Sequence, residues 1–387
     1  MKEFTTFEAL LKPITKELLK ESVNSYDADY YSKSFKTYDH LIVLLYAQLH
    51  EIKSLRDLEI AFNSQTQLKG LLNCSEVSRS TLSDANSRRP AECFLWIAEK
   101  LMSLLPRKQR KEVNKVVRKL DSSPIQLKGR GYDDWTFSNK TLRCQGIKLH
   151  VEYDSEVVAP TRVQLSHANV DDSSMGRSWP ISPNTIYVFD KGYYDFNWWW
   201  SIHSKGSFFV TRLKKNAAIQ ITKINTVSGS DVLGDNLFRF KNKAPRGGKR
   251  NLYTDELRQL IVKREGKGPI VLVTNLLDTS AETISELYKE RWDIELFFKW
   301  IKQNLKIKKF LGKSENAVKT QIAIALILYL LIALFNICEL NKKSMHQLLI
   351  WIRHNWSVRK TYYNLWKPPD YLFPKPRFSG RYSNGNL

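Results

Sequence analysis

The segment TIYVFDKGYYD, residues 185–195, begins with five apolar or β-branched residues and passes directly to an aspartate. Residues 185–189 have the composition of a buried β-strand, and Asp190 takes a place where another strand residue is expected. The segment VVRKLD, residues 116–121, repeats this pattern and ends at Asp121. An aspartate at a strand end also commonly begins a turn. The two segments therefore predict two strands that each end at a carboxylate.

Other segments between residues 116 and 340 show strand-like alternation or β-branched runs. Further strands are predicted at 147–153, 157–165, 207–213 and 268–276, and a helix at 193–203. Strands in succession, followed by strands that alternate with helices, are typical of a mixed sheet with helices packed on it. We therefore predict an α/β fold for this region.

The rest of the chain differs in pattern. Residues 1–115 place apolar residues three and four apart, which predicts an all-α N-terminal domain whose helices begin at Ser54 and Ser80. Residues 213–268 alternate and contain a basic Gly-rich turn, which predicts a β-rich insertion. Residues 341–387 form a helical and irregular tail rich in Pro and Gly. The catalytic region is expected at 116–340.

The charge of the chain indicates a polyanionic partner. Its 387 residues include 61 Lys and Arg against 39 Asp and Glu, a formal charge of +22. The cations are spread over the whole chain rather than gathered on one amphipathic segment, so nucleic acid is favoured over a membrane surface. The apolar run at 322–335 is shorter than the ~20 residues that span a bilayer, so a buried core helix is expected there.

Two further features concern the compartment. The four cysteines are far apart, so the sequence predicts neither a zinc site nor a disulfide framework. The N-terminal segment carries scattered charges and has no apolar core of the kind that directs export. The cytoplasm is therefore the expected compartment.

A narrow polar stripe is predicted on a helix at residues 288–302, YKERWDIELFFKWIK. At ~100° per residue, five residues fall in an arc of about 80°: Tyr288, Arg291, Glu295, Lys299 and Lys302. Apolar residues cover most of the remaining surface, so the stripe faces a groove rather than open solvent. The stripe can also be explained as a set of ordinary ion pairs on a helix surface. Pairs at i,i+4 such as Arg291–Glu295 and Glu295–Lys299 are common on helices and contribute only ~0.3–0.5 kcal/mol each.

The aspartates predicted at the strand ends favour a catalytic role for Glu295 over an ordinary surface ion pair. Carboxylates from two strands and one helix, Asp121, Asp190 and Glu295, are the ligands that two Mg²⁺ ions about 4 Å apart prefer. Such a pair of ions activates the attacking oxygen and stabilises the leaving oxygen of a phosphodiester. The cations beside Glu295 suit the flanking phosphates.

At these residues the chain resembles bacterial insertion-sequence transposases of the Insertion Sequence 4 superfamily. Their signature Y-x-x-R-x-x-x-E-x-x-x-x-x-x-K is matched by Tyr288, Arg291, Glu295 and Lys302. The resemblance implies a ribonuclease-H-like fold with an Asp-Asp-Glu triad, here Asp121, Asp190 and Glu295. Lys191 stands where these proteins often have Arg. The β-rich insertion and the segments SLRDLE and SRSTLSDANSRRP also fit this resemblance.

The resemblance implies cut-and-paste transposition of double-stranded DNA. Two Mg²⁺ or Mn²⁺ ions held by the triad would activate water at the terminal inverted repeats, and the freed 3′-hydroxyl would attack target DNA. Tyr288, Arg291 and Lys302 would hold the terminal phosphates. Joining of two ends implies a homodimer in the synaptic complex, with no membrane and no small-molecule cofactor.

Other basic residues are candidates for DNA contact. We predict this role for Arg88, Arg89, Arg246, Lys249, Arg250 and Lys299. An alternative interpretation of Lys299 is that it forms an ion pair with Glu295. Solvated basic loops, and helices that contact only backbone phosphates, are equally good explanations for the others. The three residues Trp198, Trp199 and Trp200 are expected in the core, with stacking on an unpaired base as the less favoured alternative.

The sequence is also compatible with two other functions. A copy without catalysis that occupies element ends would act as an inhibitor, and a metal-dependent nuclease would cleave without joining. The presence of all three acidic residues favours the enzyme over the inhibitor.

Overall fold

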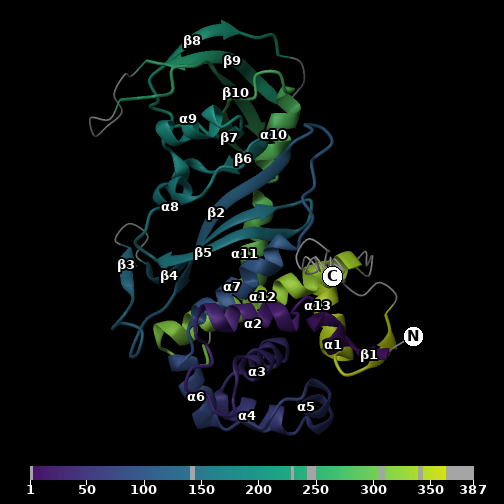
Figure 1. Ribbon diagram of the computed structural model, residues 1–387. Helices are drawn as coiled ribbons and strands as arrows, with labels where there is room; N and C mark the ends of the chain where they lie inside the picture. Colours follow the sequence, from purple (N-terminus) through teal and green to yellow (C-terminus); the bar gives the residue numbers. More distant parts are fainter. Residues whose placement is uncertain are drawn as a thin grey trace, which may run out of the picture.

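The computed structural model describes residues 3–139, 144–227, 231–241, 250–304, 310–338 and 343–362. Its central element within these ranges is one ten-stranded mixed sheet with helices on both faces (Figure 1). The predicted α/β class with a mixed sheet is therefore confirmed. The residues Arg246 and Lys249 and the tail beyond residue 362 lie outside the described ranges.

The sheet has the order β3-β4-β2-β6-β7-β11-β10-β9-β8, with β5 also paired to β4. Its strands are β2 (Val116–Gln126), β3 (Phe137–Asn139), β4 (Cys144–Asp154), β5 (Ala159–His167), β6 (Thr185–Phe189), β7 (Phe208–Arg212), β8 (Ile219–Ile224), β9 (Val232–Phe240), β10 (Leu257–Arg264) and β11 (Lys267–Thr274). The pairs β2–β6 and β6–β7 are parallel, and the other pairs are antiparallel. The predicted insertion therefore extends the edge of the same sheet through β8, β9 and β10.

The helices occupy three regions of the chain. The N-terminal helices are α1 (Thr6–Leu11), α2 (Lys16–Ser25), α3 (Thr37–Leu49), α4 (Leu55–Asn63), α5 (Thr66–Leu72), α6 (Arg79–Arg88) and α7 (Ala91–Ser103). The helices between strands are α8 (Asp172–Ser178), the 3₁₀ turn η1 (Lys191–Tyr193) and α9 (Phe196–Ser204). After the sheet follow α10 (Ala281–Lys289), α11 (Trp292–Asn304), α12 (Glu315–Cys338) and α13 (Met345–Asn355). The short strands β1 (Glu3–Thr5) and β12 (Arg359–Thr361) pair with each other.

Helix starts follow side-chain capping. Ser54 accepts a hydrogen bond from the Asp57 N–H and begins α4, as predicted. The prediction of Ser80 as a cap is wrong, because Ser78 accepts from the Thr81 N–H at 3.2 Å and α6 begins at Arg79. Ser78 has the extended backbone that a capping residue needs, whereas Ser80 already lies in the first helical turn.

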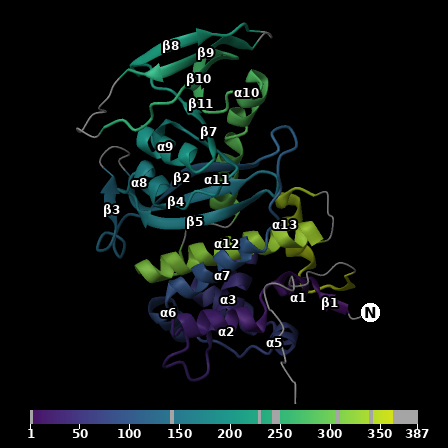
Figure 2. The ribbon, with the colours of Figure 1, turned by 45° about the horizontal axis from the view of Figure 1, so that its top comes forward.

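Helix α12 lies between the sheet and the N-terminal helices (Figure 2). Its side chains are buried almost continuously from Ala317 to Phe335. By length and composition this helix is apolar enough to cross a membrane, but most of its apolar window is inside the protein. One hydrophobic cluster joins it to α3, α7, α11 and the inner face of β4. The predicted core helix at 322–335 is therefore confirmed.

Alternation along β6 gives the sheet two apolar faces. Tyr187 and Phe189 pack with the aromatic residues of α9, where Trp198 and Trp199 are buried. Ile186 and Val188 pack against α10 on the other face. The expectation that the tryptophans belong to the core is confirmed for these two buried residues, and Trp200 is partly buried beside them. Both faces are therefore filled, and polar chemistry is confined to the strand ends.

Candidate active site

The parallel register of β2 and β6 places two aspartates side by side. Leu120 pairs with Phe189, so the next residues, Asp121 and Asp190, lie on adjacent strands with the usual spacing of ~4.8 Å between strands. Asp121 does not end its strand as predicted, because β2 continues to Gln126. Only the pairing with β6 stops there. Asp121 therefore lies where β2 loses its neighbour, which opens a side of the strand to other groups.

Asp190 is fixed by a local turn. Its carboxylate accepts a hydrogen bond from the Gly192 N–H at 2.6 Å and caps η1, while the Thr211 hydroxyl donates to its carbonyl oxygen at 3.2 Å. These bonds hold the residue after β6 in one conformation. The aspartate thus begins a turn, as the ordinary explanation holds, and its carboxylate still lies next to that of Asp121.

Glu295, the third predicted acidic residue, lies on α11 just after a break between two helices. The single helix expected over 288–302 is wrong, because α10 ends at Lys289 and α11 begins at Trp292. Between them the Arg291 N–H donates to the Tyr288 carbonyl at 3.1 Å, and the Ile294 N–H donates to the Arg291 carbonyl at 3.3 Å. These are bonds of 3₁₀ spacing. The break turns the start of α11 towards β2.

Arg291 links two carboxylates of the site. Its Nη1 lies 3.1 Å from Asp121 Oδ2, and its Nη2 donates to Glu295 Oε1. The side chain of Arg291 is only 16% exposed, so these pairs are shielded from water more than a surface ion pair is. The structure thus brings Glu295 to Asp121, with one guanidinium between them.

The remaining members of the predicted stripe lie apart. Lys299 is exposed and forms no ion pair with Glu295 in the described part of α11. Lys302 Nζ donates to Ser123 Oγ at 2.6 Å and to the Pro124 carbonyl at 2.8 Å. Lys302 therefore reaches β2 just beyond Asp121, while Lys299 faces solvent.

Burial and charge change the affinity of Asp121 for a proton. Its pKa is raised to about 6, first by burial and also by the nearby charges of Asp190 and Glu295. The Ser122 N–H, 2.8 Å from Oδ1, and the Arg291 guanidinium lower the pKa and offset part of this effect. The charges of Asp190 and Glu295 therefore act on Asp121 directly.

A buried cation anchors the helix break to the sheet. Lys119 has no exposed surface, and its Nζ lies 2.6 Å from Asp293 Oδ2 and 3.4 Å from Glu290 Oε2. Arg110 Nη1 contacts the same Glu290 oxygen at 2.5 Å. Ser155 adds a hydrogen bond to Asp293. The network holds Glu290 and Asp293 on either side of Arg291, which orients both Arg291 and Glu295.

Two more groups complete the polar surroundings. Burial raises the pKa of Tyr288, whose phenol also responds to the charges of Arg291, Arg212 and Asp190. Arg212 ends β7 and lies beside Asp190, because Val188 pairs with Val210 in parallel register. Arg212 was not among the residues predicted from the sequence. The available signal was a basic residue at the end of a β-branched strand, next to a strand that ends in an aspartate.

The other predicted DNA contacts differ in exposure. Arg88 and Arg250 are exposed. Arg89 is only 5% exposed and donates to the carbonyl oxygens of Ala28 and Phe35 and to the hydroxyl of Ser32. Its guanidinium therefore holds the segment before α3 and does not face solvent, so we leave Arg89 out of any DNA surface.

The donor set fits a hard divalent cation, although the described residues contain no group of three His, Cys, Asp or Glu side chains that is already close enough to hold one. The contacts of Arg291 explain why the acidic side chains are not closer to one another. Arg291 occupies the position between Asp121 and Glu295 as a cation of the protein itself. Carboxylate oxygens are the ligands that Mg²⁺ and Mn²⁺ prefer. Movement of one guanidinium would leave these oxygens facing each other.

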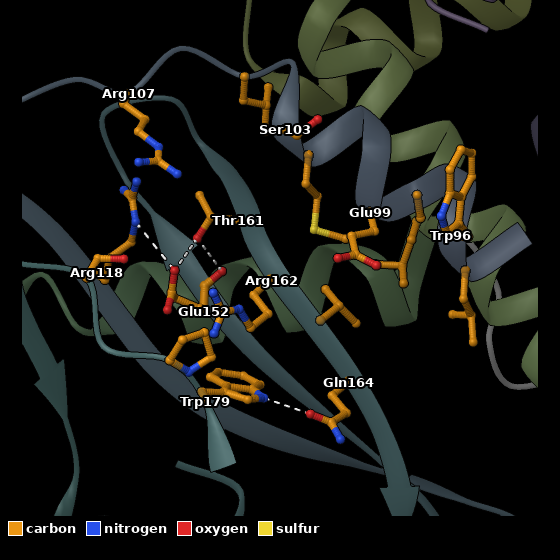
Figure 3. A pocket seen from close by; sticks show the side chains of 18 of the residues that line it. Trp96, Glu99, Ser103, Arg107, Arg118, Glu152, Thr161, Arg162, Gln164 and Trp179 are labelled. Carbon is orange, nitrogen blue, oxygen red and sulfur yellow. Dashed lines mark hydrogen bonds and ion pairs between the residues drawn. The ribbon is translucent and has the colours of Figure 1, made fainter. Parts of the chain in front are cut away.

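A separate cleft of about 910 Å³ lies at the other end of the parallel strands (Figure 3). It lies between α7 and β5, and Val116 and Thr185, the first residues of β2 and β6, line it. Its charged groups include the Arg118–Glu152 pair, whose atoms are 3.5 Å apart. The acidic triad follows the opposite strand ends and contributes no residue to this cleft. The cleft is therefore separate from Asp121, Asp190 and Glu295.

Comparisons with known proteins agree with this arrangement. A family model described as "Transposase DDE domain" matches residues 114–331, and a "Domain of unknown function (DUF4372)" matches residues 2–70. The chain is 39% identical, over 68% of its length and 72% of the relative's, to a protein of Sinorhizobium fredii named as a transposase, y4zB. It is 27% identical, over 86% of its length and 85% of the relative's, to a Geobacillus stearothermophilus protein described as a probable transposase for insertion sequence element IS5377.

A solved structure gives the same fold. The piggyBac transposase in a synaptic complex with hairpin DNA aligns over 92% of this chain and 80% of that chain, with a TM-score of 0.51 and 10% identity. The chain therefore belongs to the transposase DDE-domain family, whose function is DNA transposition. The matched range contains Asp121, Asp190 and Glu295.

The Lys119 network predicts a large loss of stability on removal of its cation. Lys119→Met leaves Asp293 and Glu290 with fewer partners, so we expect the free energy of unfolding to fall by about 3–5 kcal/mol. Urea-induced unfolding measures this change. The control Lys289→Met removes an exposed surface pair with Glu286 and should cost less than about 1 kcal/mol. Equal losses in the two variants would contradict the anchoring role.

The raised pKa of Asp121 predicts a pH-dependent stability without metal. Between its ordinary pKa of 3.8 and about 6, the folded protein keeps a proton that the unfolded chain has released. Stability therefore falls as pH rises through this window. We expect the unfolding midpoint of Asp121→Asn in EDTA to rise relative to wild type between pH about 4 and about 7. The exposed control Asp278→Asn should show no such trend. A constant difference between Asp121→Asn and wild type would refute the prediction.

Proposed function

We propose that this chain catalyses cut-and-paste transposition of an insertion sequence of the Insertion Sequence 4 superfamily, on a ribonuclease-H-like sheet. The observation that carries the proposal is the meeting of Asp121, Asp190 and Glu295 where the pairing of β2 with β6 ends, with Arg291 between two of them. Family membership supports the same chemistry. The reaction is hydrolysis at the element ends, followed by attack of the 3′-hydroxyl on target DNA.

Two Mg²⁺ or Mn²⁺ ions fit the carboxylate donor set of the triad. Bound there, they would supply an activated water and a counter-charge for the leaving oxygen. Burial raises the pKa of Asp121, and a bound cation would favour the charged form of this carboxylate.

The cations around the triad suit the DNA backbone. Arg291, released from Asp121 and Glu295, presents a planar guanidinium that binds phosphate oxygens in pairs. Tyr288 and Lys302, which complete the signature, and Arg212, beside Asp190, lie around the same carboxylates. Lys299 faces solvent on the same helix, where it can contact the DNA flank. These residues are proposed to hold the end of the element.

The remaining parts of the chain are proposed to bind more distant DNA. Residues 1–115 would form the DNA-binding helical domain, with Arg88 on its surface, and Arg250 would act from the insertion at 213–268 of the catalytic region 116–340. Residues 341–387 form the proposed tail. We propose a homodimer in the synaptic complex and a cytoplasmic, nucleoid-associated protein. The net charge of +22 supports binding of a long polyanion.

A nuclease without strand transfer and a catalytically inactive DNA-binding inhibitor are the competing functions. Inverted repeats immediately outside the gene, bordered by short target duplications, distinguish a transposase from a nuclease acting on cellular DNA. The assembled triad favours the enzyme over the inhibitor.

Replacement of Glu295 tests the catalytic assignment. We expect Glu295→Gln to reduce Mg²⁺- or Mn²⁺-dependent cleavage and joining of end-containing DNA by at least about 100-fold, more than loss of an outer-shell group causes. A gel assay with labelled ends measures both steps. The control Glu286→Gln changes an exposed carboxylate on α10 and should retain activity. Undiminished joining by Glu295→Gln would refute the assignment.

Replacement of Arg291 tests its contact with the reacting phosphate. We expect Arg291→Ala to lower end cleavage about 100-fold or more, as loss of a transition-state contact does, with only a few-fold loss of nonspecific DNA binding. Cleavage rates and fluorescence anisotropy separate the two effects. Lys289→Ala, an exposed change two residues earlier, is the control. Equal loss of cleavage and binding would reduce Arg291 to a general phosphate contact.

A further inference from the structure

A fourth carboxylate reaches the triad from α8. Asp172 is the first residue of this helix, directly after the capping residue Asp171. Its Oδ1 accepts a hydrogen bond from Ser122 Oγ at 2.6 Å and lies 3.2 Å from Lys148 Nζ. His150 Nδ1 is 3.7 Å from the same oxygen. All these contacts use Oδ1, so Oδ2 is left for another role.

The free oxygen of Asp172 faces the turn that follows β6. A Cβ atom built on Gly192 would lie 2.8 Å from Asp190 Oδ1 and 3.5 Å from Asp172 Oδ2. The space above Gly192 is therefore bordered by carboxylate oxygens from two residues. Ser173 Oγ also donates to the Gly192 carbonyl at 2.9 Å, which ties α8 to this turn. A glycine here keeps open a small gap lined by negative charge.

Two buried polar groups next to this gap lack partners in the described part of the chain. Tyr193 is 1% exposed, and its hydroxyl has no hydrogen-bond partner. Burial raises the pKa of Tyr193 well above its ordinary value, and the charges of Asp172, Asp121 and Asp190 act in the same direction. His150 Nδ1 is also buried and makes no hydrogen bond, since its contact with Asp172 Oδ1 is 3.7 Å long. Buried polar groups are normally paired, so both indicate water or an ion at this place.

We propose that Asp172 is a fourth acidic residue of the metal site and holds, through its Oδ2 and the gap above Gly192, the hydration shell of a divalent cation bound at Asp190. The inference rests on the proposed function. Mg²⁺ retains several of its waters when it is bound by one or two carboxylates, so it needs acceptors at a second distance. The Asp172 carboxylate supplies such an acceptor, and the waters give Tyr193 and His150 their missing partners.

The alternative is a purely structural Asp172 that pins α8 to β2 and β4. Asp172→Asn separates the two roles, because an amide oxygen still accepts from Ser122 and Lys148 while the negative charge is lost. Asp171→Asn is the matched control, since it makes the same change one residue earlier and keeps a capping side chain. Gly192→Ala tests the gap itself, and the backbone of Gly192 is not in the left-handed region.

Titration of the full chain with Mn²⁺, followed by electron paramagnetic resonance of the free ion, measures metal affinity independently of activity. We expect Asp172→Asn and Gly192→Ala to weaken Mn²⁺ binding about 10–100-fold, as loss of an outer-shell partner does. Asp171→Asn should bind as wild type does. Thermal unfolding in EDTA shows whether each variant is folded.

The outcomes separate this inference from the proposed function. Equal Mn²⁺ affinity of Asp172→Asn and Asp171→Asn, with binding lost in Asp121→Asn, would overturn the role of Asp172 alone. Unchanged binding by Asp121→Asn would overturn the proposed metal site and the inference with it. A wild-type protein that binds no Mn²⁺ up to about 10 mM, beyond the range of weak carboxylate sites, would do the same.

Discussion

The parallel pairing of β2 with β6 decides where the polar chemistry of this chain lies. Their register makes Asp121 and Asp190 neighbours, and the end of β6 leaves the rest of β2 open on that side. Groups from α8, η1 and α11 meet along this open side. A shift of one residue in either strand would turn its aspartate to the opposite face, where the aromatic cluster of α9 packs. The site therefore depends on a backbone register that buried residues such as Phe189 enforce.

The same site concentrates negative charge in a partly buried place, and the protein balances it with its own cations. Arg291 pairs with Asp121 and Glu295, Lys119 pairs with Asp293 and Glu290, and Lys148 pairs with Asp172. These pairs are not equivalent. Lys119 has no exposed surface and holds structure, whereas Arg291 lies nearer to solvent and can exchange its carboxylates for phosphate. The balance leaves Asp121 undercompensated, as its raised pKa indicates.

Much of this was predictable from the sequence because the signals are local. The strand that leads to Asp190, capping by Ser54 and the apolar run of α12 are short-range patterns, and the structure confirms them. The predicted strand end at Asp121 is wrong, because β2 continues to Gln126. The helix break before Trp292 was not predictable, since no Gly or Pro marks it and distant Lys119 holds the two sides. Arg89 is buried by contacts with the segment between α2 and α3, and Asp172 meets Gly192 only through the fold. Such placements arise from tertiary contacts that no sequence window contains.

Helix α12 also imposes an order on synthesis and folding. The N-terminal helices α3 and α7 bury their apolar faces against a segment that the ribosome makes more than 200 residues later. Asn316 joins the two regions as well, because its amide donates to the carbonyl oxygens of Asn86 and Arg89 at 2.8 and 2.7 Å. The apolar faces of α3 and α7 therefore remain exposed in the nascent chain until α12 has left the ribosome. A product that stops within the sheet lacks the helix that completes its first-made part, so active protein requires translation almost to the end.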